Sequence, residues 1–325
     1  MHLAAHLPAC DDSGMDQSSK YSTGELLASA RRLVARHTVS DGGKFRLSKC
    51  DPGDTGPFTD GERVAAKEST KSMLADGVKI LAELQDKLYA QDRWSLLLVF
   101  QAMDAAGKDG VIKHVMSGIN PQGCEVHSFK APSAEELDHD FMWRCSRLAP
   151  RRGMIGIFNR SYYEEVLVVR VHSEYLKRQQ LPRELVTKEI WDERFQDIRK
   201  YERYLARQGT IIRKFFLHVS KDEQRRRFLE RIEDPAKHWK FSAADIRERR
   251  HWDDYQAAYA EAISATSTAD APWYVIPADH KWFARLVAAA AIVDALRRID
   301  PRFPEVAPEA RVAQLAARDE LLAEG

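Results

Sequence analysis

The stretch that decides the fold is SLLLVFQAMDAAGKDGVIKHV, residues 95–115. Its first half is a continuous apolar run, which is typical of a strand buried on both faces of a parallel sheet. The turn Gly107-Lys108 follows, and the residues after it have the apolar spacing of a helix. In a phosphate-binding loop of this order, backbone N–H groups and the lysine contact phosphate oxygens. The stretch therefore predicts a phosphate site at the end of this strand.

The loop differs from the usual phosphate-binding pattern in its charge. Ala102 stands where the first glycine belongs, and Asp109 stands where a serine or threonine belongs. Asp104 adds a second carboxylate. Two carboxylates would repel a polyanion unless a cation lies between the carboxylates and the polyanion. Mg²⁺ prefers one or two carboxylates plus phosphate oxygens. We therefore predict a metal-bridged phosphate chain, with Asp104 as the first metal ligand, Asp109 as the second, and phosphate contacts from Gly107, Lys108, Asp109, Gly110 and Lys113. A helix cap at Asp104, or a chance pattern, is the simpler alternative.

Other apolar runs predict the rest of the sheet. Strands are expected at 96–100, 154–158, 210–219 and 273–278, and a weaker one at 125–129. A long helix is expected at 62–90, before the first strand, and further helical segments lie between the strands, notably at 188–209. Strands that alternate with helices indicate an α/β fold with a central parallel sheet covered on both faces. Such sheets bind ligands beyond the carboxyl ends of their strands.

A second polar segment, NRSYYEE, follows the strand at 154–158. Asn159 stands where a phosphate-loop kinase places an acidic residue, so metal binding would depend on Asp104 or on Glu164. Arg160 is placed to neutralise the oxygens of a transferring phosphoryl group. In the alternative interpretation, Asn159 caps a helix and Arg160 is an ordinary surface group.

A basic segment follows the strand at 210–219. Residues 213–251 contain twelve Lys and Arg against seven Asp and Glu. The segment reads as two helices joined near Asp234-Pro235, which would lie above the strand ends. A helical lid over about 221–252 could close on phosphate and exclude water. A solvated charged helix face is the alternative.

Composition limits the class of protein. The chain has 325 residues, with 50 Lys and Arg against 49 Asp and Glu, so polyanion binding must come from local clusters of charge. The four cysteines have no metal-ligand spacing, and neither a secretory signal nor a membrane span is evident. We therefore expect a cytoplasmic protein with no membrane association. Nucleic-acid binding is not expected, because the basic segment lacks a reading helix or a stacking motif.

Five stretches together resemble a known family: QAMDAAGKDGVIKHV, NPQGCEVHSFKAPS, IFNRSYYEEVLVVRV, FFLHVSKDEQRRRFLERIEDPAKHWKFS and STADAPWYVIPADHKW. They are similar to the second family of polyphosphate kinases, and within it to the class III polyphosphate:nucleotide phosphotransferases. The resemblance covers about 45–295. It implies a P-loop kinase-like three-layer sandwich with a helical lid. The expected domains are a flexible N-terminal extension (1–45), a P-loop polyphosphate kinase domain (46–300) and a C-terminal tail with a linker and one short helix (301–325).

The same resemblance implies roles for individual residues. Asp104, Lys108 and Arg160 would be catalytic, and Lys130 would line the polyphosphate channel. The basic lid residues that would bind phosphate are Arg225, Arg226, Arg227, Arg231, Lys237 and Lys240. The metal shell is less defined than in many members, because Asn159 replaces an aspartate there.

The function expected from these observations is reversible phosphoryl transfer between inorganic polyphosphate and nucleotides, from AMP to ADP and from ADP to ATP. Mg²⁺ is the expected cofactor and Mn²⁺ a substitute for it, and a homo-oligomer, dimeric or tetrameric, is a family expectation. Two alternatives stay open. One is an ATP-dependent nucleotide or small-molecule kinase, and the other is a non-catalytic module that binds polyphosphate or nucleotide.

Overall fold

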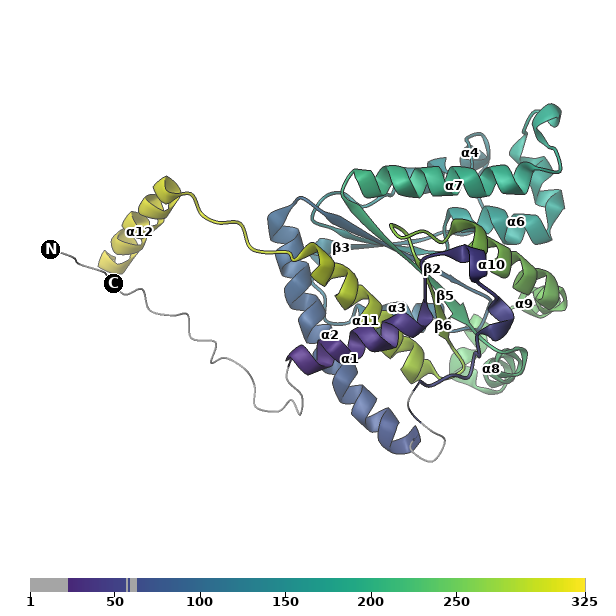
Figure 1. The fold of residues 1–325 in the computed structure, drawn as a ribbon, viewed down its shortest axis with the longest axis horizontal. Helices are drawn as coiled ribbons and strands as arrows, with labels where there is room; N and C mark the ends of the chain where they lie inside the picture. The colour runs from purple at the N-terminus through teal and green to yellow at the C-terminus, as the bar shows by residue number, and fades with distance from the viewer. Residues whose placement is uncertain (1–22, 57, 59–62, 325) are drawn as a thin grey trace.

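A computed structural model describes residues 23–324 except 57 and 59–62. Its centre is a six-stranded sheet in the order β1-β6-β5-β2-β4-β3 (Figure 1). All neighbouring strands are parallel except β1, which pairs antiparallel with β6. The strands are β1 (Thr38–Val39), β2 (Ser95–Ala102), β3 (Cys124–Ser128), β4 (Ile155–Asn159), β5 (Thr210–His218) and β6 (Trp273–Pro277). The predicted α/β class and parallel sheet are confirmed, with the short β1 as an antiparallel addition at one edge.

The strand register brings the polar segments to one edge of the sheet. β2 lies between β4 and β5, with Phe100 opposite Asn159 and Ala102 opposite Leu217. The carboxyl ends of parallel strands meet at the same edge, so the loops that follow β2, β4, β5 and β6 gather there. This edge carries the candidate site.

One face of the sheet is covered by α1 (Thr23–His37), α2 (Arg63–Gln91), α3 (Lys108–Val115) and α11 (Lys281–Ile299). The core on this side contains Leu98 and Phe100 of β2 together with Val287 and Ile292 of α11. The α11 helix is apolar almost all round, because it lies between the sheet and the outer helices (Figure 1). The site loop therefore starts from a strand that is fixed on this face.

The opposite face is covered by α6 (Val168–Val171), α7 (Ile190–Arg207) and α10 (Trp252–Thr266). Two short helices, α4 (Ala134–Leu137) and α5 (Trp143–Ser146), follow β3 in the chain. Phe158, Tyr163 and Trp273 form the centre of this second core. The two cores make the molecule a three-layer sandwich, as predicted.

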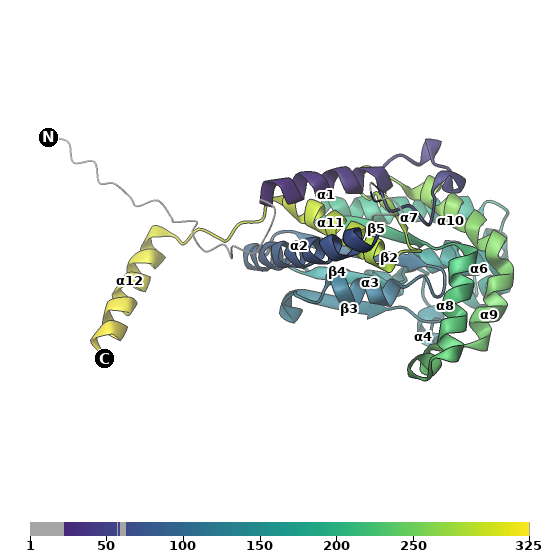
Figure 2. The ribbon, with the colours of Figure 1, turned by 90° about the horizontal axis from the view of Figure 1, so that it is seen from below.

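The lid consists of three short elements after β5. α8 (Lys221–Glu233) is followed by a 3₁₀ turn, Pro235–Lys240, and by α9 (Ala243–Glu248). Figure 2 shows α8 and α9 at the end of the molecule opposite α12. The predicted break at Asp234-Pro235 is confirmed, although a 3₁₀ turn separates the two helices. Ser220 caps α8 by accepting a hydrogen bond from the Glu223 N–H.

The N-terminal region differs from the flexible extension predicted over 1–45. Residues 23–37 form α1, which packs on α11, and Arg31 pairs with Asp294 at 3.3 Å. Two 3₁₀ turns, Gly42–Lys44 and Leu47–Lys49, follow β1. Residues 1–22 lie outside the described residues.

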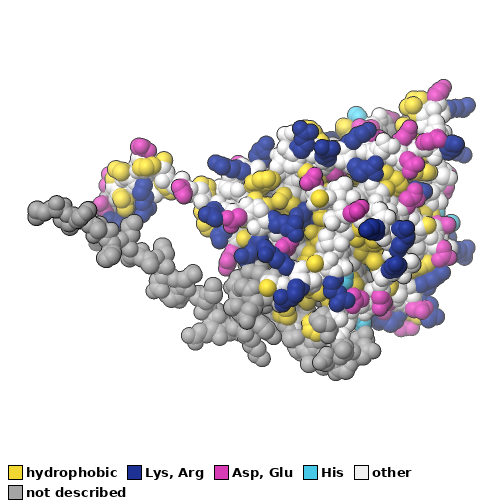
Figure 3. Space-filling model, viewed as in Figure 1, with side chains coloured by type: hydrophobic (Ala, Val, Ile, Leu, Met, Phe, Trp, Pro, Cys, Tyr) yellow, Lys and Arg dark blue, Asp and Glu magenta, His cyan; other side chains and the backbone are white. Residues whose placement is uncertain are grey.

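The predicted C-terminal helix is present as α12 (Pro308–Ala323) and has no buried residue. Figure 3 shows its apolar side chains clear of the body, and Val312 is 68% exposed. Within the part of the chain that the structure describes, no helix combines the length and apolar character needed to cross a bilayer.

A buried ion pair joins α7 to β5, and its loss should destabilise the fold. Lys214 Nζ lies 2.7 Å from Glu202 Oε2 and donates to the Thr266 carbonyl oxygen at 2.7 Å, with both side chains fully buried. Glu202→Gln should lower the free energy of unfolding by about 3 kcal/mol, because it leaves a buried ammonium without its counter-charge. Urea denaturation measures this, with Asp197→Asn of the exposed Asp197–Lys200 pair as control. A loss no larger than that of the control would contradict the prediction.

Candidate active site

The loop between β2 and α3 has the geometry of an anion-binding nest. Ala105 and Gly107 both have left-handed backbone conformations, with φ of +61° and +100°. Among the described residues, the backbone N–H groups of Gly107 through Gly110 have no hydrogen-bond partner, because they form the loop end and first turn of α3. Such N–H groups, with the positive end of a helix dipole, attract phosphate.

A polar chain connects this loop to the end of β4. Lys108 Nζ donates to Asn159 Oδ1, and Asn159 Nδ2 donates to Asp109 Oδ1 at 2.9 Å. Burial and, to a smaller extent, the nearby Arg160 charge lower the pKa of Lys108 to about 8, although the neighbouring carboxylates oppose this shift. Lys108 is therefore a poorly solvated cation that would gain from an anionic ligand.

Arg160 lies in a strained position at the end of β4. Its φ is +65°, and its backbone N–H donates to the Phe100 carbonyl oxygen at 3.0 Å. Its guanidinium lies 3.4 Å from Asp104 Oδ1. Burial raises the pKa of the Glu164 carboxyl, while Arg160 and Lys108 oppose that shift. The structure thus brings Asp104, Lys108, Arg160 and Glu164 together, as the sequence predicts for two adjacent strand ends.

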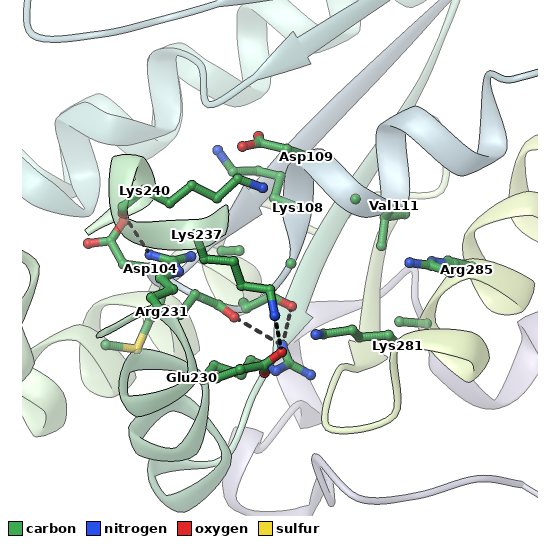
Figure 4. A pocket seen from close by; sticks show the side chains of 18 of the residues that line it. Asp104, Lys108, Asp109, Val111, Glu230, Arg231, Lys237, Lys240, Lys281 and Arg285 are labelled. Atoms are coloured by element: carbon green, nitrogen blue, oxygen red, sulfur yellow. Dashed lines mark hydrogen bonds and ion pairs between the residues drawn. The ribbon is translucent and has the colours of Figure 1, made fainter. Parts of the chain in front are cut away.

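The main pocket opens over the loop and has a volume of about 480 Å³. Eight Lys or Arg side chains and three Asp or Glu line it. Figure 4 shows Lys281 and Arg285 of α11 on one side of this pocket and Arg231 and Lys240 of the lid on the other. The basic residues of the lining are Lys108, Arg160, Arg227, Arg231, Lys237, Lys240, Lys281 and Arg285.

Sequence analysis did not identify Lys281 and Arg285. They lie in the first turns of α11, directly after the carboxyl end of β6. The signal was available in HKWFAR at 280–285, because a helix that begins beyond the last strand of a parallel sheet presents its first turns to the ligand edge.

Two of the lid cations in the main pocket, Lys237 and Arg231, are paired with lid carboxylates. Lys237 Nζ lies 2.6 Å from Glu230 Oε1 and 2.7 Å from Asp234 Oδ2, and Arg231 lies 3.6 Å from Asp245. These pairs are partly exposed, so each is weak and can exchange for a phosphate oxygen. The lid can therefore supply cations without rearranging its backbone.

Some residues predicted to bind phosphate do not line the main pocket. Lys113 and Lys130 are exposed outside it. Arg225 and Arg226 lie on the outer face of α8 and pair with Asp222 and Glu223. Arg227 lines the main pocket, and all five of its N–H groups are used in hydrogen bonds to the protein.

A second pocket meets the main pocket at Asp104 and Arg160. Besides Asp104, three carboxylates and two tyrosines line it: Glu164, Asp245, Glu248, Tyr255 and Tyr259. Its volume is about 50 Å³, which is too small for a nucleoside. A nucleoside could therefore enter only if the lid elements moved. Asp104 and Arg160 stand between the two pockets.

The acidic side chains suit a divalent cation that is bound mainly through phosphate. The described residues contain no group of three or more His, Cys, Asp or Glu side chains that could hold a metal alone. Asp104 and Asp109 both line the main pocket, where they would supply the one or two carboxylates that Mg²⁺ prefers, with phosphate oxygens completing its shell. The donor set fits Mg²⁺ or Mn²⁺ in this arrangement.

Comparisons with known proteins agree with this geometry. A crystal structure of polyphosphate kinase 2 from Arthrobacter aurescens TC1 superposes with a TM-score of 0.79, at 39% identity, covering 90% of this chain and 97% of that one. The ADP-polyphosphate phosphotransferase of Rhodopseudomonas palustris is 52% identical over 285 residues, 87% of this chain and 96% of that protein. The AMP/ADP-polyphosphate phosphotransferase of Meiothermus ruber is 44% identical over 272 residues, 84% and 96% of the two chains.

The sequence profile described as Polyphosphate kinase 2 (PPK2) matches residues 64–304, which include both strand-end motifs, the lid and α11. The match covers most of the chain, and the identity to the R. palustris protein extends beyond it. The chain belongs to the polyphosphate kinase 2 family.

Proposed function

We propose that the protein transfers phosphoryl groups reversibly between inorganic polyphosphate and the nucleotides AMP and ADP. The observation that carries the proposal is the main pocket, where a phosphate-binding loop faces cations from three further elements. A long polyanion needs such an extended row of positive charge. The names of the relatives, an ADP- and an AMP/ADP-polyphosphate phosphotransferase, support these substrates.

The residues act by positioning and by charge, because phosphoryl transfer has a loose transition state whose charge is spread over the equatorial oxygens. The N–H groups of the loop and Lys108 would hold the phosphate chain. Arg160, between the two pockets, would contact the transferring group. A bound Mg²⁺ would neutralise phosphate charge, held by Asp104 and Asp109. No proton has to leave the acceptor, because a nucleotide phosphate is already anionic.

The acceptor would approach from the second pocket. Tyr255 and Tyr259 offer aromatic surface there, and Asp104 and Arg160 are shared with the main pocket. The terminal phosphate of AMP or ADP would then meet the end of the polyphosphate chain beside Arg160. Because the second pocket is closed to a nucleoside here, the lid must open before the nucleotide enters.

The direct test is turnover of purified protein with Mg²⁺, long-chain polyphosphate and AMP or ADP, measured as ADP and ATP formed. Lys108→Met should lower the rate by about a hundredfold or more, because it removes a charge that faces the phosphates. Turnover with ATP and a second acceptor, but none with polyphosphate, would favour the ATP-dependent kinase. Tight polyphosphate binding without any turnover would favour the binding module.

The low pKa of Lys108 predicts how polyphosphate affinity depends on pH. Below about pH 8, Lys108 is charged in the free protein; above it, binding must take up a proton. The dissociation constant should therefore rise with pH above 8, approaching about tenfold per pH unit. Calorimetry in buffers of different ionisation heat measures both the affinity and the proton uptake. Lys108→Arg should abolish the pH-dependent step, because arginine stays charged. An unchanged step in that variant would assign it to another group.

The metal assignment predicts a specific defect for Asp104→Asn. The amide keeps the shape of the side chain but is a weak Mg²⁺ ligand, so we expect activity to fall by about a hundredfold or more and the Mg²⁺ concentration for half-maximal rate to rise. Asp222→Asn, on the exposed face of α8, is the matched control. A wild-type Mg²⁺ dependence in Asp104→Asn would show that Asp104 is not a metal ligand.

A further inference from the structure

Three consecutive carbonyl groups of the phosphate-binding loop are held by side chains of the lid helix α8. Gln224 Nε2 donates to the Asp104 carbonyl oxygen at 2.9 Å. Arg227 Nη1 donates to the carbonyl oxygens of Ala105 and Ala106 at 3.0 and 2.7 Å. Gln224 and Arg227 are 2% and 4% exposed. The loop is thus fixed from its outer side by two buried side chains.

These contacts set the direction of the loop N–H groups. In a trans peptide the C=O and the following N–H point in opposite directions. With the carbonyls of Asp104 and Ala106 turned toward α8, the N–H groups of Ala105 and Gly107 point away from it, and both residues line the main pocket. The left-handed conformation of Ala105 is unfavourable for a residue with a side chain, and it persists only where its surroundings fix it.

Arg227 has no capacity left for a ligand in this conformation. Its Nη2 donates to the carbonyl oxygens of Ala278 and Asp279 at 2.5 and 3.1 Å, and its Nε donates to Glu223 at 2.7 Å. It therefore ties the loops after β2 and β6 to α8. An arginine is suited to this, because its planar fork directs five donors in fixed directions.

Gln224 also connects the loop to Arg249, the lid residue that directly follows α9. Its amide oxygen accepts a hydrogen bond from Arg249 Nη1 at 2.7 Å, and Arg249 lines the second pocket. A continuous path thus runs from the second pocket through Arg249 and Gln224 to the backbone of Asp104. Movement of the lid would therefore shift the backbone of Asp104, which lies between the two pockets.

We propose that Gln224 and Arg227 are positioning residues through which the lid helix shapes the phosphate-binding loop. Arg227 lines the main pocket and Gln224 the second, but the hydrogen bonds of both side chains go to the loop and to other residues of the protein. They hold the loop carbonyls outward, and Gln224 couples the position of Asp104 to the lid. The inference rests on the proposed function for its catalytic consequence, although the effect on phosphate binding does not depend on it.

Gln224→Glu is the sharpest test, because it keeps the shape and the Arg249 partner while replacing the donor to the Asp104 carbonyl with an acceptor. We expect tripolyphosphate to bind about tenfold more weakly. In polyphosphate turnover we expect kcat to fall by at least about tenfold. Amide hydrogen exchange of residues 105–110 should become faster. Gln224→Met, which removes both hydrogen bonds, should show the same direction of change.

Gln85→Met is the matched control, because Gln85 is equally buried but lies on α2 at the other end of the sheet. It should leave affinity, kcat and loop exchange unchanged. Arg227→Lys should also weaken tripolyphosphate binding, since a single ammonium cannot reach all the acceptors of the Arg227 guanidinium. If that variant fails to fold, Gln224→Glu still tests the positioning role.

Binding and hydrogen exchange need no catalysis, so the two proposals can fail separately. Wild-type protein without polyphosphate turnover would overturn the proposed function alone. Gln224→Glu with tripolyphosphate affinity, kcat and loop exchange within about twofold of the wild type would overturn the positioning role.

Discussion

The contact between α8 and the loop after β2 is the constraint on which the site depends. A loop that binds phosphate must expose its N–H groups, and this leaves its carbonyl groups to be satisfied on the other side. Here the acceptors are paired with Gln224 and Arg227 of the helix that also begins the lid. The phosphate loop and the lid are therefore one structural unit, although 120 residues separate Asp104 from Gln224.

Charge balance explains why a nearly neutral protein can present such a basic pocket. Four of the eight cations come from the lid, two from α11, and one each from the loop after β2 and the end of β4. Several of the lid cations are neutralised by neighbours, as Lys237 is by Glu230 and Asp234. Such exposed pairs contribute little to stability, so exchanging a carboxylate for a phosphate oxygen costs little. The acidic residues therefore reduce the mutual repulsion of the lid cations.

The strands and the loop could be predicted from the sequence because their signals are local. Continuous apolar runs identified β2 and β4, and the Gly107-Lys108 turn identified the start of α3. Other features depend on distant partners. Helix α1 packs on α11 through Ala30, Leu33 and Val34, whose spacing fits a helix although the region was predicted to be a flexible extension. Lys113 resembled its phosphate-binding neighbours in sequence, yet it lies on the exposed side of α3.

The run Arg225-Arg226-Arg227 shows why composition alone could not assign the lid. A helix repeats every 3.6 residues, so three adjacent arginines point in three directions. Gln224, Arg227, Phe228 and Arg231 follow one another at the spacing of a single face, and this is the face that meets the loop and the pocket. On this face Gln224 and Arg227 bind backbone carbonyl groups of the loop. The other two arginines lie on the solvent face, where they pair with acids of the same helix. The position of a basic residue on the helix therefore decides its role: Arg227 contacts the loop, whereas the other two arginines face solvent and do not line the pocket.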